Sequence, residues 1–453
     1  MNKWILIVTM WLGFTAVTIA DVINVPDDFG TIQQAIDSAQ VGDTVLVAPG
    51  TYVENVDFHG KKLVVASWFL TTGDTSYISQ TVIDGNADST TVSIQNFEPA
   101  GTELTGFSIT NGLGTGDWPN VRGGGIHIRT SSPSIRYCYI YNNETVGSSN
   151  RGAGIYASSQ YSYISNCRIY NNTSFVGPGI AIGNGAFGTI VDSCWIANNF
   201  GLDAILIAYS QFVTISNTFI VDNDSRALRS FTSNATKLIH CTIAGNGAEG
   251  VAAYGNGADT TYIINSIIYG NNPSFDFGND TLVVAQYSLI EGADTSYFFG
   301  TGCLDADPLF APNYQLSENS PAIDAGDPTM PLDPDGTVAD MGAAYYNQNV
   351  TAIGDDDSAI PTKITLFANY PNPFNPETTI GFQLPAAGDV TLEIYTITGQ
   401  LVKTLVGGLQ PAGKFTVKWN GTNQFGKPVS SGVYLYRLAV GNVVQTRKMI
   451  LLR

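Results

Sequence analysis

The chain has 453 residues, of which 13% are charged and 48 are glycine, and its formal net charge is −18. So few charges and so many glycines argue against a disordered or a helical chain and favour strands joined by tight turns. A nucleic-acid partner is also disfavoured, because no basic stripe is available to neutralise phosphate groups. The length predicts two or three domains.

Residues 1–20 have the features of a secretory signal peptide. Lys3 precedes an apolar run from Trp4 to Ala16, and a cleavage site of small residues ends at Ala20. The run is too short to span a bilayer as a helix, and no other apolar stretch of the sequence approaches about 20 residues. We therefore expect an exported protein with no integral membrane segment after signal removal.

A short amphipathic helix is predicted from Thr31 to Ala39. Ile32, Ala35 and Ile36 share one face of it, and glycine follows at position 42. Such a helix would cover the open edge of the strands that come next. Those strands are predicted at residues 45–47, 63–66, 82–83, 92–94 and 107–109.

From Phe107 to Gly292 a short phrase recurs about once every 25 residues. It has a small residue, an aliphatic residue two positions on and an asparagine three positions further, as in Cys138, Ile140 and Asn143. The phrase begins at positions 138, 167, 194, 218, 241 and 266, so the spacings are 29, 27, 24, 23 and 25 residues. Insertions that fall between phrases but never inside them are typical of a solenoid.

The alternation within each phrase predicts short parallel strands with one buried face. A second strand, opened by a small residue, lies upstream of each phrase and begins at Gly125-Ile126, Gly154-Ile155, Gly179-Ile180, Ala204-Ile205, Ala227-Leu228 and Gly250-Val251. Two or three strands per coil leave no room for a helix, so we predict an all-β fold whose coils stack about 4.8 Å apart. In this pattern the sequence resembles the right-handed parallel β-helix family typified by pectate-lyase-like proteins.

Stacked coils place like residues above one another. The six asparagines of the phrase are predicted to form a ladder at one turn, where Asn tolerates a left-handed backbone and its amide bonds to the next coil. Four cysteines share one repeat position with Thr218 and Ser266, and we interpret them as small buried residues: Cys138, Cys167, Cys194 and Cys241. The alternative is a disulfide between Cys138 and Cys167 if the pair is oxidised.

After the regular coils, residues 305–343 read as a closing segment that should cap the far end of the core. The β-helix unit is thus expected to span residues 21–350, followed by a charged linker at 351–362. Strands predicted at 379–382, 390–395, 414–419 and 433–438 then indicate a small antiparallel β-sandwich at residues 363–453.

This last unit carries several specific phrases, including Tyr370 to Pro376, Ser431 to Tyr434 and Lys448 to Arg453. In these phrases it resembles the C-terminal sorting domain of the type IX secretion system, an immunoglobulin-like module related to the flagellar hook cap. The resemblance implies the type IX secretion machinery as a partner, and secretion or display on the outer membrane of a Gram-negative bacterium.

Catalysis would have to occur on the outside of the solenoid. His127, Arg129 and Tyr156 occupy outward positions on neighbouring strands, where a His or Tyr could abstract a proton while the Arg neutralises a uronate. The competing interpretation is a solvated strand face. Deeper coils carry Ala181, Leu206 and Ala252 at the same position and are not expected to extend the site. The hydrolase motifs of polygalacturonase-like enzymes are also missing from the solenoid.

Outward aromatic residues form a second candidate. Tyr139, Trp195 and Phe219 follow the small residue of three phrases, and Tyr141 and Tyr170 lie two positions further along two of them. Stacked rings of this kind would offer apolar faces to sugar rings, unless they only pack beneath loops. These five residues are therefore candidates for a carbohydrate-binding surface, with packing as the competing interpretation.

A weaker candidate is the turn formed by Asp333, Asp335 and Asp340, whose carboxylates could hold Ca²⁺. A turn of this composition also forms without an ion. The leading hypothesis is therefore a monomeric, non-catalytic surface or secreted protein that contacts polysaccharide and has no cofactor. The alternative is a polysaccharide lyase or glycoside hydrolase.

Overall fold

The computed structural model describes residues 20–115, 123–147, 151–255, 259–277, 282–292, 299–348, 350–352, 363–385, 388–410, 413–424, 427–441 and 443–452. The predicted signal peptide lies outside these ranges except for Ala20, and so does the predicted linker except for residues 351–352.

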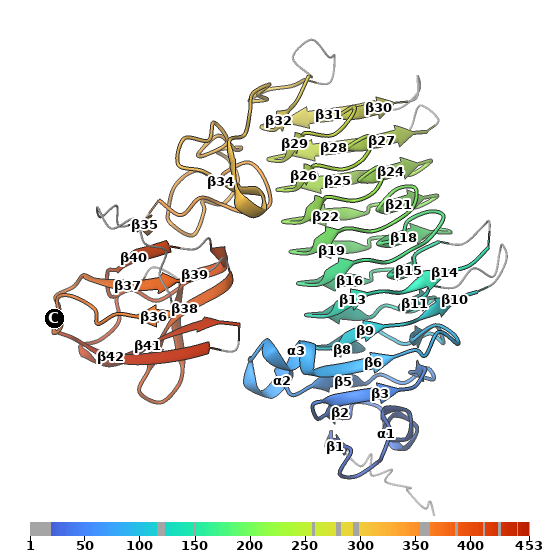
Figure 1. Cartoon of the computed structure of the whole chain (residues 1–453), viewed down its shortest axis with the longest axis horizontal. Helices are drawn as coiled ribbons and strands as arrows, with labels where there is room; N and C mark the ends of the chain where they lie inside the picture. Colours follow the sequence, from blue (N-terminus) through green and yellow to red (C-terminus); the bar gives the residue numbers. More distant parts are fainter. Residues whose placement is uncertain are drawn as a thin grey trace, which may run out of the picture.

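Three parallel sheets wind around one core to form a β-solenoid, which confirms the predicted all-β fold (Figure 1). Each coil visits the three sheets in turn, so successive strands of one sheet come from successive coils.

The eleven-stranded sheet, called sheet A, consists of β1 (Val22–Val25), β2 (Thr44–Val47), β5 (Val64–Ser67), β8 (Glu103–Thr105), β12 (Ser134–Arg136), β16 (Tyr163–Ser165), β19 (Ile190–Asp192), β22 (Thr214–Ser216), β25 (Thr236–Ile239), β28 (Thr260–Ile264) and β31 (Leu282–Gln286). The ten-stranded sheet, called sheet B, consists of β3 (Gly50–Val53), β6 (Thr81–Asp84), β9 (Ser108–Thr110), β13 (Tyr139–Tyr141), β17 (Arg168–Tyr170), β20 (Trp195–Ala197), β23 (Phe219–Val221), β26 (Thr242–Ala244), β29 (Ile267–Tyr269) and β32 (Leu289–Ile290). The nine-stranded sheet, called sheet C, consists of β4 (Val56–Asp57), β7 (Val92–Ile94), β11 (Ile126–Arg129), β15 (Ile155–Ser158), β18 (Ile180–Gly183), β21 (Ile205–Ala208), β24 (Leu228–Phe231), β27 (Val251–Tyr254) and β30 (Phe275–Phe277). A two-stranded parallel pair is formed by β10 (Leu113–Gly114) and β14 (Glu144–Thr145).

The inward residues of the three sheets form one continuous core. In a single coil Ile135, Ile140 and Ile155 come from sheets A, B and C, and all three are fully buried in it. Burial of each such side chain contributes about 1.5–3 kcal/mol relative to exposure. The four cysteines that share one repeat position, here called the ladder cysteines, are buried in the same core as free thiols, in agreement with the prediction.

The asparagine ladder is present, and it lies inside the solenoid. From Asn143 to Asn246, each side-chain amide donates to the asparagine of the next coil, as in Asn143 Nδ2 to Asn172 Oδ1 at 3.0 Å and Asn172 Nδ2 to Asn199 Oδ1 at 3.0 Å. The expectation that the ladder residues are left-handed is wrong: positive φ occurs one position earlier, as at Asn142 (53°) and Asn171 (54°). The left-handed residue turns the chain, so the next side chain points inward.

The small residue at the start of each sheet C strand is explained by this ladder. A Cβ added to Gly125 would come within 2.9 Å of Asn143 Nδ2 and 2.7 Å of the Gly154 carbonyl oxygen. Only the smallest side chains fit where the asparagine amide crosses beneath the strand.

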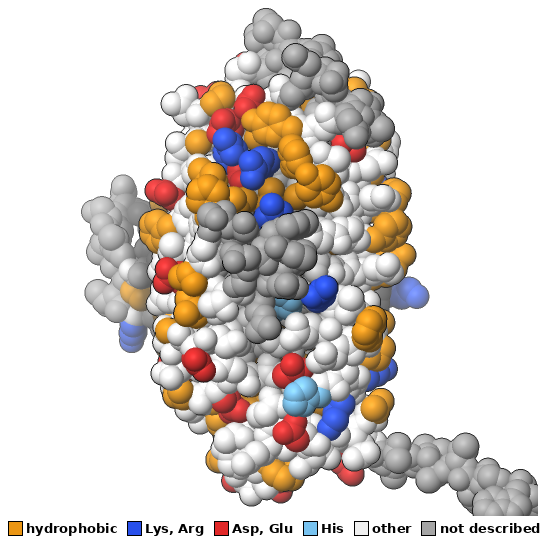
Figure 2. Space-filling model, turned by 90° about the vertical axis from the view of Figure 1, so that its right-hand side faces the viewer, with side chains coloured by type: hydrophobic (Ala, Val, Ile, Leu, Met, Phe, Trp, Pro, Cys, Tyr) orange, Lys and Arg blue, Asp and Glu red, His pale blue; other side chains and the backbone are white. Residues whose placement is uncertain are grey.

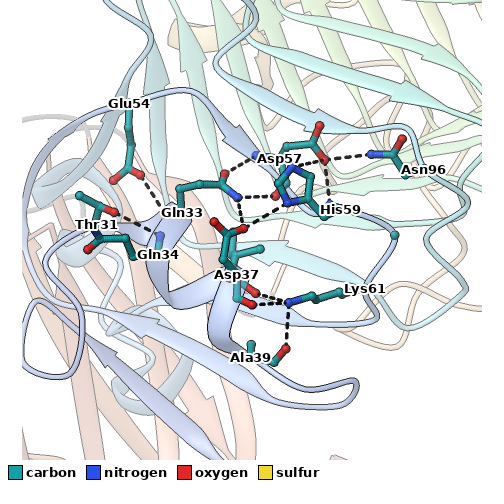
Figure 3. A network of polar contacts seen from close by, with 12 residues as sticks. Thr31, Gln33, Gln34, Asp37, Ala39, Glu54, Asp57, His59, Lys61 and Asn96 are labelled. Atoms are coloured by element: carbon teal, nitrogen blue, oxygen red, sulfur yellow. Dashed lines mark hydrogen bonds and ion pairs between the residues drawn. The ribbon is translucent and has the colours of Figure 1, made fainter.

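The predicted N-terminal helix is α1 (Ile32–Ser38), capped by the Thr31 side chain. Its ends are held by charges of opposite sign, as Figure 3 shows. The Glu54 carboxylate accepts from the backbone N–H groups of Ile32 and Gln33, both at 2.9 Å. The Lys61 ammonium donates to carbonyls of the last turn at 2.7–3.0 Å. Both contacts complement the helix dipole, so α1 is fixed against the first coils.

Two further helices, α2 (Phe69–Thr72) and α3 (Ser76–Gln80), connect β5 to β6. The closing segment contains β33 (Phe310–Ala311), the 3₁₀ turn η1 (Pro312–Tyr314) and β34 (Gln315–Leu316). It differs from the predicted cap, since it packs along the outer face of sheet B: Leu316 and Met341 contact Ile267 and Leu289. The closing segment packs there because the last coils carry apolar residues on their outer face. Phe299 and Cys303, which precede the closing segment, pack against the solenoid core in its place.

The C-terminal unit consists of two four-stranded antiparallel sheets, as predicted. One contains β35 (Val350–Ala352), β36 (Thr365–Leu366), β37 (Thr378–Leu384) and β40 (Gly413–Trp419), and the other β38 (Gly388–Thr396), β39 (Leu401–Gln410), β41 (Gly432–Val440) and β42 (Val443–Leu451). The predicted sequence boundary shifts, because β35 pairs with β40 and so belongs to this unit although it precedes residue 363. In Figure 1 the unit lies beside the solenoid.

Candidate functional site

The predicted aromatic residues of sheet B form a column on its outer face. Strand register places Tyr139, Arg168, Trp195 and Phe219 on four successive coils. The Trp195 and Phe219 rings lie 4.8 Å apart with their planes tilted by 34°, and the Arg168 guanidinium lies 5.6 Å from the Tyr139 ring centroid. The column therefore combines apolar ring faces with one cation.

This column lines a cavity of about 920 Å³. The closing segment contributes Gln315, Tyr345 and Tyr346 to the lining, and the C-terminal unit contributes Asp389 and Val406. Arg168 Nη2 lies 3.7 Å from Asp389 Oδ2 across the cavity. Burial raises the pKa of Tyr139, and the Arg168 charge opposes that shift. The volume is within the range of clefts that bind small molecules and sugars.

Tyr141 and Tyr170 do not line the cavity. They form a separate pair on the second outward column of sheet B, with ring centroids 5.1 Å apart and planes 8° from parallel. Further along that column Ala197, Val221 and Ala244 are covered by Phe310 and Tyr314 of the closing segment. The five aromatic residues predicted as one surface thus divide into a cavity wall and an isolated stacked pair.

The structure brings two of the three catalytic candidates together. His127 and Tyr156 are neighbours in register on sheet C, and their rings stack with centroids 5.4 Å apart. Both side chains are only 3% exposed, whereas Arg129 is exposed. His127 Nδ1 accepts from the Gly123 N–H at 3.1 Å, and the Tyr156 hydroxyl accepts from Asn184 Nδ2 at 2.5 Å. Burial raises the pKa of Tyr156, which favours its neutral form. These contacts favour packing over proton abstraction.

A charged cluster that sequence reasoning missed lies on the same outer face of sheet C. Asp203 is fully buried between two arginines: its Oδ1 pairs with Arg226 Nη1 at 2.7 Å and its Oδ2 with Arg229 Nη2 at 2.8 Å. Arg226 Nε also pairs with Glu249 Oε2 at 2.9 Å. Burial raises the pKa of Asp203, and the two arginine charges oppose that rise. We call Asp203, Arg226, Arg229 and Glu249 the sheet C charge cluster.

The outward column of sheet C was predicted to be apolar beyond Tyr156. Ala181, Leu206 and Ala252 do occupy it, but Arg229 lies between Leu206 and Ala252 in register. The sequence does contain a pattern that indicates the charge cluster. Asp203, Arg226 and Glu249 each immediately precede the small residue that opens a sheet C strand, and they are spaced by 23 residues. Alternating charge at that spacing predicts ion pairs between coils.

Aromatic residues border the sheet C charge cluster. Phe231 lies on the same strand as Arg229 and meets Tyr209 edge-on, with centroids 5.5 Å apart. Tyr209 is 51% exposed and Phe231 is 38% exposed. On the next coil the Tyr254 hydroxyl donates to Asp276, and burial together with that carboxylate raises the pKa of Tyr254 to about 12. Figure 2 shows basic side chains grouped with hydrophobic and acidic ones on this face.

The predicted calcium turn directs its carboxylates to backbone groups. Asp333 Oδ2 accepts from the Asp340 N–H at 2.8 Å, and Asp340 accepts from the N–H groups of Asp324 and Tyr346. Asp335 accepts from the N–H groups of Thr337 and Gln348. Within the described ranges there is no group of three or more His, Cys, Asp or Glu side chains that could hold a metal ion. Burial raises the pKa of Asp333 to about 6 and of Asp340 to about 7.

Two families match parts of the chain. Residues 98–272 match the family described as a right handed beta helix region, and residues 370–442 match the FlgD Ig-like domain. No curated protein matches the chain. Among the described residues, none of the helices has the length and apolar character needed to cross a membrane.

Several solved structures are similar to the chain in fold. Pectate lyase Pel9A is 16% identical, and the match covers 73% of this chain and 98% of that protein with a TM-score of 0.43. Tailspike protein 2 of bacteriophage CBA120 is 11% identical over 95% of this chain and 76% of that one, with a TM-score of 0.36. PorZ of Porphyromonas gingivalis, a bacterial surface component of the type-IX secretion system, is 25% identical over 20% of this chain and 11% of its own length, with a TM-score of 0.15. TM-scores this low say nothing about the activity of the chain.

Proposed function

We propose that this protein is exported and contacts carbohydrate without catalysing a reaction, and that the outer face of sheet B is where sugar rings stack. The observation that supports this is the cavity of about 920 Å³ walled by Tyr139, Arg168, Trp195 and Phe219. Ring faces match the apolar faces of sugars, while Arg168 and Gln315 offer donors and acceptors to hydroxyl groups.

The test is retention on a panel of neutral and acidic polysaccharides, with simultaneous detection of unsaturated or reducing products. At least one glycan should retain the protein without product, and Trp195→Ala should weaken binding about tenfold, which corresponds to about 1.4 kcal/mol. Phe97→Ala is the matched control, because that ring is 78% exposed and lies outside the cavity lining. Product formation would favour the lyase or hydrolase alternative, and loss of all retention would contradict the proposal.

We also propose that residues 363–453 act as a type IX sorting module that delivers the β-helix unit to the surface or medium of a Gram-negative cell. The support is the match to the FlgD Ig-like domain together with the sequence phrases that resemble sorting domains. Deletion of residues 363–453 in a bacterium with this secretion system should leave the β-helix unit in the periplasm. Unchanged secretion of the truncated chain would refute the assignment.

A further inference from the structure

The sheet C charge cluster holds two like charges close together around a buried carboxylate. Asp203 is fully buried, while the side chains of Arg226 and Arg229 remain 22% and 26% exposed. Removing a carboxylate from water is unfavourable, so a purely structural role would be served as well by the apolar residues found on neighbouring coils. The arrangement instead fixes the orientation of two guanidinium groups at the surface.

The ion pairs leave part of each guanidinium group available. They use Nε and Nη1 of Arg226 and Nη2 of Arg229. Arg229 Nε is buried without a hydrogen-bond partner. Nη2 of Arg226 and Nη1 of Arg229 take part in none of the ion pairs and hydrogen bonds given for the described residues, and about a quarter of each arginine side chain stays exposed, at 22% and 26%. Two oriented N–H donors of this kind match a planar carboxylate.

The surroundings suit a sugar ring better than an isolated anion. Leu206 and Ala252 lie in register on either side of Arg229 and make the outer face of sheet C apolar there. The exposed rings of Phe231 and Tyr209 lie at the border of this surface. Asp203 and Glu249 balance the two arginine charges, and the chain carries a net charge of −18. General attraction for polyanions is therefore weak, and any anion must be held by local, directional contacts.

We propose that the sheet C charge cluster, together with Phe231 and Tyr209, binds a uronic acid unit of an acidic polysaccharide. Arg226 and Arg229 hold the sugar carboxylate, and the aromatic rings contact the sugar faces. This site lies on a different sheet from the cavity of sheet B, so either site can fail without the other.

The test measures the affinity of the full chain for polygalacturonate and polymannuronate, for methyl-esterified polygalacturonate and for dextran sulfate. The main variant is Arg229→Leu, since Leu206 already occupies that position one coil away. The double variant Asp203→Asn with Arg229→Leu avoids an unpaired buried carboxylate and serves if the single variant unfolds. Arg136→Leu, which removes a partly exposed arginine 3.8 Å from Glu103 on sheet A, is the control.

We expect binding of at least one uronate polymer, a loss of at least tenfold in affinity for Arg229→Leu or the double variant, and no change for Arg136→Leu. The methyl ester should bind at least tenfold more weakly than the acid. Unchanged affinity in the Arg229 variants, equal binding of ester and acid, dextran sulfate binding as tight as uronate, or no uronate binding would each overturn the proposal. Retention on neutral glycans that is lost in Trp195→Ala but kept in Arg229→Leu would still support the sheet B cavity, so the two proposals fail separately.

Discussion

Replacement of Asn199 by alanine should destabilise the solenoid more than almost any other polar substitution. Asn199 lies in the middle of the ladder, where its Nδ2 donates to the Ile169 and Ala197 carbonyls and to Asn223 Oδ1 at 3.0–3.1 Å. Its Oδ1 accepts from the backbone N–H and the side-chain amide of Asn172. All of these partners are buried or partly buried, so water cannot replace the lost contacts.

The magnitude follows from the groups left without a partner. The substitution deprives the Asn172 N–H of its acceptor and the Ile169 carbonyl of a donor, and each such buried group costs about 1–3 kcal/mol. Removing the amide also leaves a small void in the packed core. We therefore expect a loss of about 3–5 kcal/mol in the free energy of unfolding of the β-helix unit.

Urea unfolding, followed by tryptophan fluorescence and circular dichroism, measures this loss. The adjacent substitution Asn198→Gly is the control: Asn198 is exposed and has φ of 54°, so glycine at this position should change stability by less than about 1 kcal/mol. A loss below about 1 kcal/mol for Asn199→Ala would refute the view that the ladder amides bind the coils together.

Three further outcomes are expected. Lys61→Met removes hydrogen bonds to two α1 carbonyls and to the carbonyl of the C-cap Ala39, and should lower stability by about 1–3 kcal/mol, with faster amide hydrogen exchange in Ile32–Ser38. The folded-state pKa of Asp340 is raised to about 7, so folding favours the protonated form of this side chain. The stability of the protein should therefore fall as pH rises from about 4 through 7. In thermal unfolding, Asp340→Asn should reduce this dependence of stability on pH. Burial raises the pKa of the Cys138 and Cys167 thiols well above normal, so in native protein at pH 8 a thiol reagent should label the partly exposed Cys303 first and the ladder cysteines only after denaturation.

The repeat and the inside and outside of each coil could be predicted from sequence because they depend on local periodicity. A residue two positions from Cys138 must share its face of the strand, and insertions between phrases do not alter that relation. The asparagine ladder could be predicted for the same reason, because one asparagine recurs at a fixed position of each phrase. The error of one residue in placing the left-handed backbone arose because spacing identifies the repeated side chain and not the dihedral angle of its neighbour.

The outward surfaces depended on contacts between distant parts of the chain. Nothing local to Trp195 shows that the closing segment and the C-terminal unit enclose its column, and nothing local to His127 shows that it is buried. Asp203 and Arg229 are 26 positions apart in sequence, and only the register of stacked coils makes them an ion pair.

The amino-acid sequence by itself thus determined the solenoid, its core and its division into two folded units, because hydrophobic spacing and turn residues act over a few positions. The tertiary structure alone decided that the closing segment covers the last coils of sheet B and that Arg226 and Arg229 meet around Asp203. Those arrangements depend on which surfaces of distant segments are complementary, and no short stretch of sequence contains that information.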